Sequence, residues 1–193
     1  MLLLARHGQS QLNVQGVVNG DPALDPGLSP LGLEQAAGLG RQLAAISIDL
    51  CVTSRFPRAR ETARLALGSR VETVPHRVEP DLDDIRIGEL EGKTLAEYRA
   101  WKHAHLPGAA FPGGESLLDA ARRYALAFER LADLPQPVVL CVCHEIPVRY
   151  AVNAASGSDE LDGPLHDIAN ATPYVFDQDG LRRAVTRLRA LAR

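Results

Sequence analysis

Two short apolar runs, each ending near a histidine, constrain the fold of this chain more than any other feature. Leu2–Ala5 form the first run, which stops abruptly at Arg6 and His7. Residues Pro137–Val142 form the second, which leads to His144. Apolar runs of this length, closed by polar residues, are typical of buried strands in an α/β sheet. Because ligands of such sheets bind at the carboxyl ends of the strands, the two runs predict one edge that carries two imidazoles.

Strand-like and helix-like patterns alternate along the rest of the chain, which predicts an α/β fold. The expected helices are Ser29–Ala44, Arg58–Leu67, Thr94–His103, Leu117–Ala132 and Pro147–Ala154, and the further strands are Ile46–Thr53 and Val71–Val74. We expect a loop over residues 9–27 and a closing hairpin made by Tyr174–Phe176 and Leu181–Leu188. The alternation favours one three-layer domain over residues 1–193, with a mostly parallel central sheet flanked by helices and an insertion at about 77–114 over the site.

The composition excludes several classes of function. Of the 193 residues, 46% are hydrophobic and 23% are charged, and the formal net charge of −3 gives no bulk field for nucleic acid or an anionic membrane. No apolar run approaches the roughly 20 residues of a membrane span. The first residues lack the basic region and longer apolar stretch of a signal peptide, so we expect a cytoplasmic protein. Three cysteines without framework spacing fit a reducing compartment.

The sequence lacks the spacing of known metal and nucleotide sites. Cys141, Cys143 and His144 are close in sequence, but on an extended strand the two cysteines face one way and the histidine faces the other. No paired C-x-x-C, P-loop, G-x-G-x-x-G or G-x-S-x-G motif occurs. We therefore expect neither a metal ion nor a cofactor. The sequence does not indicate an oligomeric state.

Six sequence blocks occur in an order that points to one family. The first is Arg6-His7-Gly8-Gln9-Ser10, followed by Asn13. The others are Leu28–Gly32 with Gln35-Ala36, Thr53-Ser54 with Arg58-Ala59 and Glu61–Ala63, Leu82–Ile85 with Gly88 and Glu91-Gly92, Gly113–Ser116, and the strand end at His144. Together these blocks resemble the histidine phosphatase (phosphoglycerate-mutase-like) superfamily over nearly the whole chain.

The resemblance implies a role for each matching residue. His7 would be the nucleophile that forms a phosphohistidine. Arg6 and Arg58 would hold the phosphoryl oxygens and stabilise the charge that spreads over them in the transition state. His144 would donate to the same oxygens from the opposite side. Asp84 lies where the family has its general acid, which protonates the leaving oxygen and then activates water.

The acid position departs from the family pattern, which usually has glutamate. Asp84 is one methylene shorter. Either the loop that carries Asp84 lies closer to the substrate, or a neighbouring acid such as Asp83 or Glu89 supplies the proton.

Four further residues are candidates for binding the substrate. Asn13 would line the pocket, and Ser10 and Gly20 belong to the loop that follows the first strand. The fourth candidate, Glu145, stands where the family usually has glycine. A carboxylate beside a phosphate pocket would repel the substrate unless it points away, so the environment of His144 is expected to differ from that of relatives.

The leading hypothesis is a metal-independent phosphomonoesterase that acts on a small phosphorylated metabolite. A phosphoglycerate mutase would share the chemistry, but the loop after Asn13 lacks the tryptophan-bearing pattern associated with mutases, and the chain is short for one. The third possibility is a catalytically weak module that binds a phospholigand, for which Asp84 and Glu145 would be signs of decay. Tyr98 and Trp101 either cap the substrate or pack in the core. The sequence carries no readable code for the physiological substrate.

Overall fold

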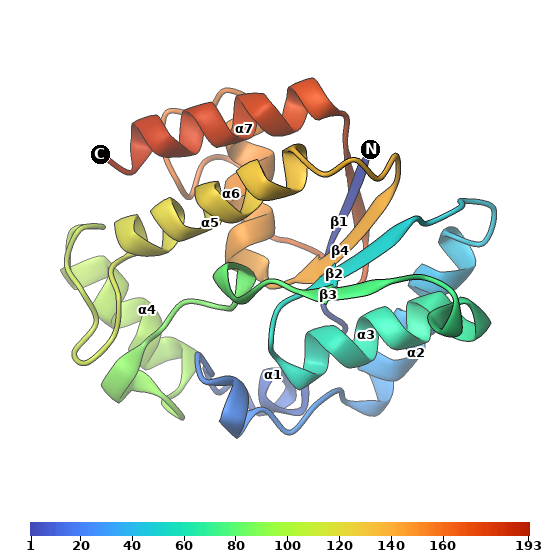
Figure 1. The fold of residues 1–193 in the computed structure, drawn as a ribbon. Helices are drawn as coiled ribbons and strands as arrows, with labels where there is room; N and C mark the ends of the chain where they lie inside the picture. Colours follow the sequence, from blue (N-terminus) through green and yellow to red (C-terminus); the bar gives the residue numbers. More distant parts are fainter.

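A five-stranded sheet forms the centre of the molecule. The computed structural model describes residues 1–193, and the strands lie in the order β3-β2-β4-β1-β5 (Figure 1). The strands are β1 (Leu2–Arg6), β2 (Leu50–Thr53), β3 (His76–Val78), β4 (Val139–Cys143) and β5 (Pro173–Phe176). Strands β1 to β4 pair in parallel, whereas β5 pairs antiparallel with β1. The prediction of a mostly parallel α/β sheet is confirmed.

The two apolar runs of the sequence are neighbouring strands at the centre of this sheet. β1 and β4 pair in parallel with Arg6 opposite Cys143. The ladder continues one residue further, because the His7 N–H donates to the Cys143 carbonyl over 2.9 Å. Every residue of β4 is buried, as is typical of a strand covered on both faces. This register brings His7 and His144 to the same edge of the sheet.

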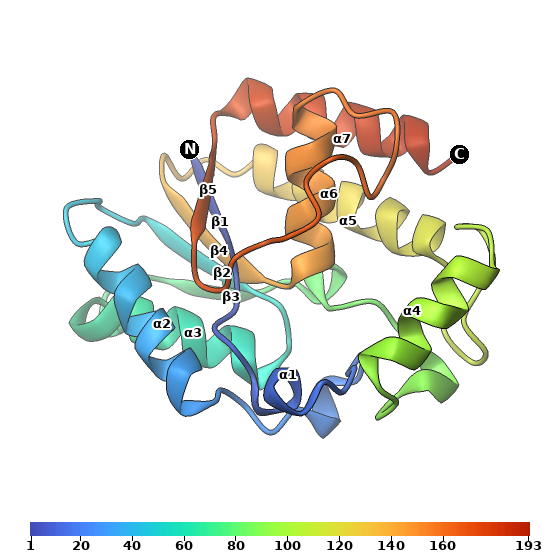
Figure 2. The same cartoon turned by 180° about the vertical axis from the view of Figure 1, so that it is seen from behind.

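Helices cover both faces of the sheet and complete three layers (Figures 1 and 2). The helices are α1 (Gln11–Gln15), α2 (Pro30–Gln42), α3 (Pro57–Leu67), α4 (Leu95–Ala104), α5 (Leu117–Ala132), α6 (Glu145–Ala155) and α7 (Gln178–Leu191). Alternate residues of β1 point to opposite faces. Leu3 and Ala5 pack in the core beneath α2 and α3, and Leu2 and Leu4 pack in the larger core beneath α5, α6 and α7. No helix combines the length and apolar character that crossing a membrane requires.

The chain ends in a helix, so the predicted closing hairpin is wrong. β5 forms near the expected position, but residues 178–191 form α7. Its first turn is capped by Asp177, whose side chain accepts the Gly180 N–H. Leu181 and Leu188 are buried where α7 packs against α5 and α6. Their spacing of seven residues is helical, and this pattern outweighs the turn-like Asp-Gly pair near the start of the segment.

Two other local predictions are wrong. Residues 71–74 do not form a strand, because the short 3₁₀ helix Gly68–Glu72 follows α3, and the third strand is β3. β3 pairs only with β2 and its side chains are exposed, so it carries little of the hydrophobic pattern that marks a strand. The expected loop over residues 9–27 contains the helix α1, which a capping box between Ser10 and Asn13 initiates.

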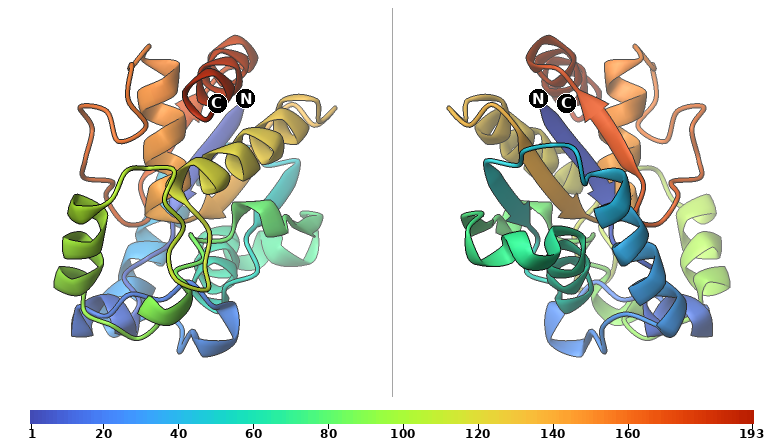
Figure 3. Two further views of the ribbon diagram at one scale, coloured as in Figure 1. Left: turned by 90° about the vertical axis from the view of Figure 1, so that its left-hand side faces the viewer. Right: turned by 90° about the vertical axis from the view of Figure 1, so that its right-hand side faces the viewer.

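The segment between β3 and α5 lies at the carboxyl edge of the sheet, as the predicted insertion requires (Figure 3). It docks on the loop that follows β1, where the Val18 N–H donates to the Lys93 carbonyl over 2.9 Å. Tyr98 and Trp101 of α4 pack against Phe111, with ring centroids 5.5 Å and 4.2 Å away. Both aromatic residues therefore hold the insertion together, and Tyr98 also lines a cavity at this edge of the sheet.

A buried arginine of α5 fixes the loop that carries Asp84. The Arg123 guanidinium donates to the carbonyls of Asp81 and Asp83 over 2.9 Å each and to that of Asp84 over 3.3 Å. Glu115 pairs with Arg123 at 2.5 Å, and both side chains are at most 10% exposed. The position of Asp84 at the sheet edge thus depends on an ion pair in the adjacent helix layer.

Replacing this arginine should destabilise the protein strongly. Arg123→Met leaves the Glu115 carboxylate buried without its partner, so we expect the free energy of unfolding in urea to fall by about 3 kcal/mol or more. Arg122→Met is the matched control, since the Arg122 side chain is 51% exposed and pairs only with Asp119. Its effect should stay below about 0.5 kcal/mol. Equal losses in the two variants would contradict this account.

Candidate active site

The His7 ring is held at the end of β1 with one nitrogen directed at its neighbouring cation. Nδ1 lies 2.6 Å from the Gly8 carbonyl, which can only accept, so Nδ1 carries the proton. Nε2 therefore has a lone pair, and it accepts the Arg58 Nε–H over 3.0 Å. The Gly8 N–H donates to Thr62 Oγ1 and ties the turn to α3. The backbone thus sets the tautomer in which Nε2 is unprotonated.

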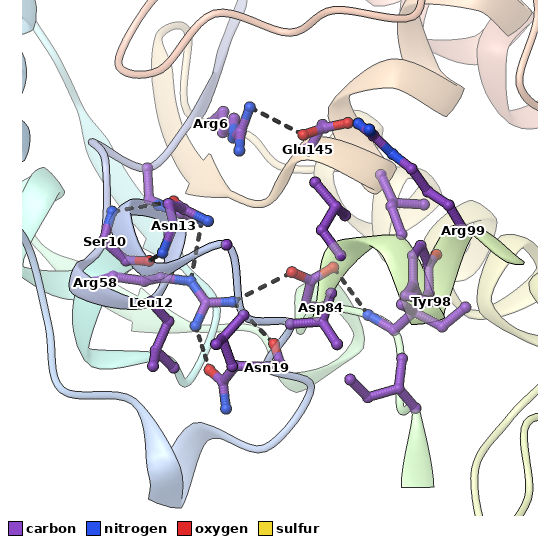
Figure 4. Close-up of a pocket in the computed structure, with 18 of the residues that line it drawn as sticks. Arg6, Ser10, Leu12, Asn13, Asn19, Arg58, Asp84, Tyr98, Arg99 and Glu145 are labelled. Carbon is purple, nitrogen blue, oxygen red and sulfur yellow. Dashed lines mark hydrogen bonds and ion pairs between the residues drawn. The ribbon is translucent and has the colours of Figure 1, made fainter. Parts of the chain in front are cut away.

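Arg58 lies in the first turn of α3 and connects the other groups of the site (Figure 4). Its side chain is 4% exposed. Nη1 donates to Asn19 Oδ1 over 2.5 Å, and Nη2 lies 3.2 Å from both Asp84 Oδ2 and His144 Nδ1. The Phe56 ring stacks below the guanidinium, 4.2 Å from its central carbon. One buried cation therefore contacts both histidines and the candidate acid.

His144 directly follows β4 and is fully buried. Its ring centroid lies 5.3 Å from that of His7. Because a guanidinium has no acceptor, Nδ1 accepts the Arg58 N–H, and Nε2 then donates to Ser54 Oγ over 2.8 Å. A hydroxyl can also donate, so Ser54 can support the opposite tautomer when His144 donates to a ligand. The strand end predicted from the sequence does bring the two imidazoles together.

Arg6 and Glu145 form an ion pair on the wall of the cavity (Figure 4). Arg6 Nη1 lies 2.9 Å from Glu145 Oε2 and donates to the Ile168 carbonyl over 2.9 Å. Arg149 Nη1 approaches the other carboxylate oxygen of Glu145 at 3.2 Å. Arg6 Nε is buried without a partner. The Glu145 carboxylate therefore faces the site, and two arginines balance its charge.

The three acids considered as proton donors occupy different positions. Asp84 lines the cavity, and its side chain is 21% exposed. Asp83 is buried elsewhere, since its carboxylate accepts the backbone and side-chain N–H groups of Arg55 over 2.8 Å and 2.6 Å. Glu89 is exposed and does not line the cavity. Only the Asp84 carboxyl group lies beside both Arg58 and the second histidine.

The candidate residues of the loop after β1 divide into two groups. Ser10 and Asn13 line the cavity, but each is engaged in capping α1: Asn13 Oδ1 accepts the Ser10 N–H, and Ser10 Oγ accepts the Asn13 N–H. The Asn13 amide nitrogen remains available to a ligand. Gly20 does not line the cavity. A Cβ at Gly20 would lie 2.3 Å from the Ile85 carbonyl, so glycine is needed for close packing of this loop on the insertion.

Three residues that hold Arg58 in place could not be assigned this role from sequence patterns. Asn19 accepts from Arg58, and its own amide donates to Glu91 over 2.7 Å. Glu91 also accepts the Gly20 N–H over 2.7 Å. The Asp25 carboxylate accepts the backbone N–H of Arg58 over 2.9 Å. These contacts join segments far apart in the chain, which periodicity cannot reveal, although Glu91 belongs to one of the family-like blocks.

The environment keeps both histidines neutral. Burial, followed by the charges of Arg58 and Arg6, lowers the pKa of His7 well below its usual value of 6.5. Burial and then Arg58 do the same to the pKa of His144. Burial raises the pKa of Asp84 above that of an ordinary aspartate, against the opposing pull of Arg58. The site therefore combines a neutral imidazole, whose Nε2 carries no proton, with a carboxyl group that keeps its proton to a higher pH than an ordinary aspartate does.

The cavity has a volume of about 220 Å³ and is lined by residues of the loop after β1, the insertion and α6. Of the three cysteines, Cys141 and Cys143 are buried within β4. No cluster of histidine, cysteine, aspartate and glutamate side chains is arranged to hold a metal ion. The positive charges that act most strongly on His7 are those of Arg58 and Arg6.

Comparison with known families and proteins identifies the chain. A model of the histidine phosphatase superfamily, branch 1, matches residues 2–190. The chain belongs to this superfamily. Among characterised relatives, a 2,3-bisphosphoglycerate-dependent phosphoglycerate mutase of Methylobacterium sp. (strain 4-46) is 31% identical over 190 residues, which cover 91% of this chain and 90% of the mutase. The human 6-phosphofructo-2-kinase/fructose-2,6-bisphosphatase 4 is 32% identical over 91% of this chain, which spans 38% of that protein.

Solved structures of histidine phosphatases share the fold. The α-ribazole phosphatase from Shigella flexneri superimposes with a TM-score of 0.71 at 30% identity, over 81% of this chain and 79% of that one. A mycobacterial glucosyl-3-phosphoglycerate phosphatase gives a TM-score of 0.63 at 31% identity, over 80% and 77% of the two chains. Phosphatases and mutases thus both occur among the proteins similar to this one, and the family resemblance seen in the sequence is confirmed.

The neutral state of the two imidazoles can be tested by NMR titration. We expect the His7 and His144 rings to remain neutral well below pH 6.5, and we expect both pKa values to rise in Arg58→Met, which removes a positive charge next to each ring. The control is Arg60→Met, an exposed position two residues further along α3, which should instead raise the pKa of His76. A His7 ring that titrates at or above 6.5 in the unaltered protein would refute this electrostatic account.

Proposed function

We propose that this protein is a metal-independent phosphomonoesterase that hydrolyses a small phosphorylated metabolite through a phosphohistidine on His7. The observation that supports this proposal is that His7, Arg6, Arg58 and Asp84 line one cavity, while the buried His144 contacts Arg58 directly beside it. This set contains a nucleophile, fixed positive charges and a proton donor, which are the groups that phosphoryl transfer needs.

In the first step, the lone pair of His7 Nε2 attacks phosphorus while the bond between phosphorus and the leaving oxygen breaks. The leaving oxygen takes the proton of Asp84, whose raised pKa favours the protonated form before the reaction. The Nδ1–H stays on the Gly8 carbonyl, so the phosphorylated ring is cationic. A cationic ring is a good leaving group, which prepares the second step.

In the second step, water attacks the phosphohistidine. The Asp84 carboxylate accepts a proton from the water as the new oxygen–phosphorus bond forms. The nitrogen–phosphorus bond breaks and its electron pair returns to Nε2. Inorganic phosphate leaves, and Asp84 is protonated again. One carboxyl group therefore serves as acid and then as base.

The positive charges stabilise the phosphoryl oxygens during both steps. The Arg58 Nε–H, which now donates to His7, turns to a phosphoryl oxygen when substrate binds. Arg6 Nε, which is buried without a partner, is a second donor, and the Asn13 amide is a third. The His144 ring, which is fully buried and contacts Arg58, becomes a donor once Arg58 turns to the ligand. Apart from this turn of Arg58 on binding, the protein holds the donors in place before the chemical steps begin, so little reorganisation accompanies the reaction.

The alternative function is that of a phosphoglycerate mutase, because one similar protein has that activity. The first step would be the same, and the phosphoryl group would then pass to a hydroxyl of the substrate rather than to water. A module that only binds a phospholigand would perform neither step. The fate of the phosphoryl group distinguishes the three.

Rapid-quench labelling tests the proposal. In the presence of EDTA, brief incubation with ³²P-labelled p-nitrophenyl phosphate should leave acid-labile phosphate on the protein and release inorganic phosphate at steady state. His7→Ala should show neither. Asp84→Asn should accumulate the labelled protein, because nitrophenolate leaves without a proton whereas the attack of water loses its base.

Each other outcome has a distinct meaning. Stoichiometric binding without label or release would favour a binding module. Label that passes to added 3-phosphoglycerate faster than to water would favour a mutase. Loss of activity in EDTA, or label that persists in His7→Ala, would overturn the proposed mechanism.

A further inference from the structure

Glu145 occupies a position in the cavity that the proposed hydrolysis does not use. It is the first residue of α6 and follows His144 directly. Its side chain lines the cavity and is 36% exposed. The carboxylate lies between Arg6 at 2.9 Å and Arg149 at 3.2 Å, on the side of the cavity away from α3 (Figure 4). A negative charge therefore stands beside the place where a phosphoryl group would bind.

The cations near Glu145 are almost all neutralised by partners within the protein. Arg149 and Lys102 both line the cavity, and each lies 2.9 Å from the carboxylate of Asp162. Arg149 also pairs with Glu145. Arg99 is the cation of this wall that forms no ion pair, and it is exposed on α4. An exposed cation attracts an anion weakly, because water and salt screen its charge.

Beside these charged groups the cavity also has an apolar part. Its hydrophobic lining residues are Leu12, Val17, Val18, Ile85, Ile87, Leu95, Tyr98 and Ile146. An anionic group placed there would lose hydration without gaining an unpaired buried cation. An uncharged group would lose much less.

Glu145 does not prevent the first phosphoryl group from binding. It contacts Arg6 only through Nη1, whereas Arg6 Nε is buried without a partner. Arg58 makes no contact with Glu145 and keeps its full charge for the phosphoryl oxygens. The Glu145 carboxylate thus affects binding of the alcohol part of the ester rather than binding of its phosphoryl group.

We propose that Glu145 is a specificity-determining residue that restricts the substrate to phosphomonoesters of uncharged alcohols. Like charges at close range repel, so an ester with a carboxylate or a second phosphate near the reacting group binds poorly. This inference rests on the proposed phosphatase function and names its substrate class. It also bears on the mutase alternative, because transfer between two hydroxyls of one substrate passes through a doubly phosphorylated molecule, which Glu145 would repel.

A pair of nearly isosteric substrates tests the inference. Glycerol 3-phosphate and 3-phosphoglycerate differ in one hydroxymethyl group that is replaced by a carboxylate. We expect the unaltered protein to favour glycerol 3-phosphate in kcat/KM by about tenfold or more, which corresponds to about 1.4 kcal/mol. In Glu145→Gln, which keeps the shape and removes the charge, the ratio of the two kcat/KM values should shift toward 3-phosphoglycerate by a similar factor.

Using the ratio cancels any effect of Glu145→Gln on the shared chemistry, such as a change in the position of Arg6. The matched control is Glu160→Gln, an exposed glutamate outside the cavity, which should leave the ratio unchanged. Arg99→Gln tests the competing possibility that Arg99 receives a second anion.

Three results would overturn the inference. The first is an unchanged ratio in Glu145→Gln, which would assign Glu145 a role in the shared chemistry or in structure. The second is a preference of the unaltered protein for 3-phosphoglycerate that Arg99→Gln abolishes. The third is absence of turnover of both esters and of p-nitrophenyl phosphate by the unaltered protein, which would contradict the proposed phosphatase function itself.

Discussion

The contact between the buried Arg58 guanidinium and the two imidazoles is the interaction on which the rest of the site depends. A buried cation is costly unless it is hydrogen-bonded and paired. Arg58 meets this requirement by donating to Asn19 and Asp84 and by pairing with the buried carboxylate of Asp25, and the Phe56 ring covers one face. These contacts come from three segments of the chain: the loop after β1, the residue before α3 and the insertion. The charge of Arg58 therefore both assembles the site and sets its electrostatics.

As a consequence of this arrangement, the histidines stay neutral and Asp84 favours its protonated form, which suits nucleophilic attack by His7. The nearby positive charge and the lack of water disfavour a second positive charge, so His7 and His144 stay neutral. The same burial favours the protonated form of Asp84. The Gly8 carbonyl selects the tautomer of His7 in which Nε2 is free of a proton. Burial, the charge of Arg58 and the Gly8 carbonyl thus set the protonation states that phosphoryl transfer needs.

The parts of this arrangement that could be predicted from the sequence are those set by local pattern. The two apolar runs predict β1 and β4, and parallel pairing then places His7 and His144 together. The residues that aim Arg58 could not be assigned in this way, because the contact between Asn19 and Glu91 joins positions 72 residues apart. The orientation of Glu145 also could not be predicted from the sequence. It depends on Arg149, one turn further along α6, and on Arg6 at the end of β1. The final helix was missed because an Asp-Gly pair resembles a turn, although packing against α5 and α6 makes helix the better use of the same residues.

The most direct test of the central claim is a crystal structure of the protein with bound orthovanadate, which mimics a phosphoryl group during transfer. We expect vanadium bonded to His7 Nε2, with its equatorial oxygens held by Arg6, Arg58 and His144 and its far apical oxygen beside Asp84. Arg58 Nε should have left His7 for an oxygen of the ligand. Vanadate bound elsewhere, or bound in this cavity with the Arg58–His7 hydrogen bond intact, would contradict the account.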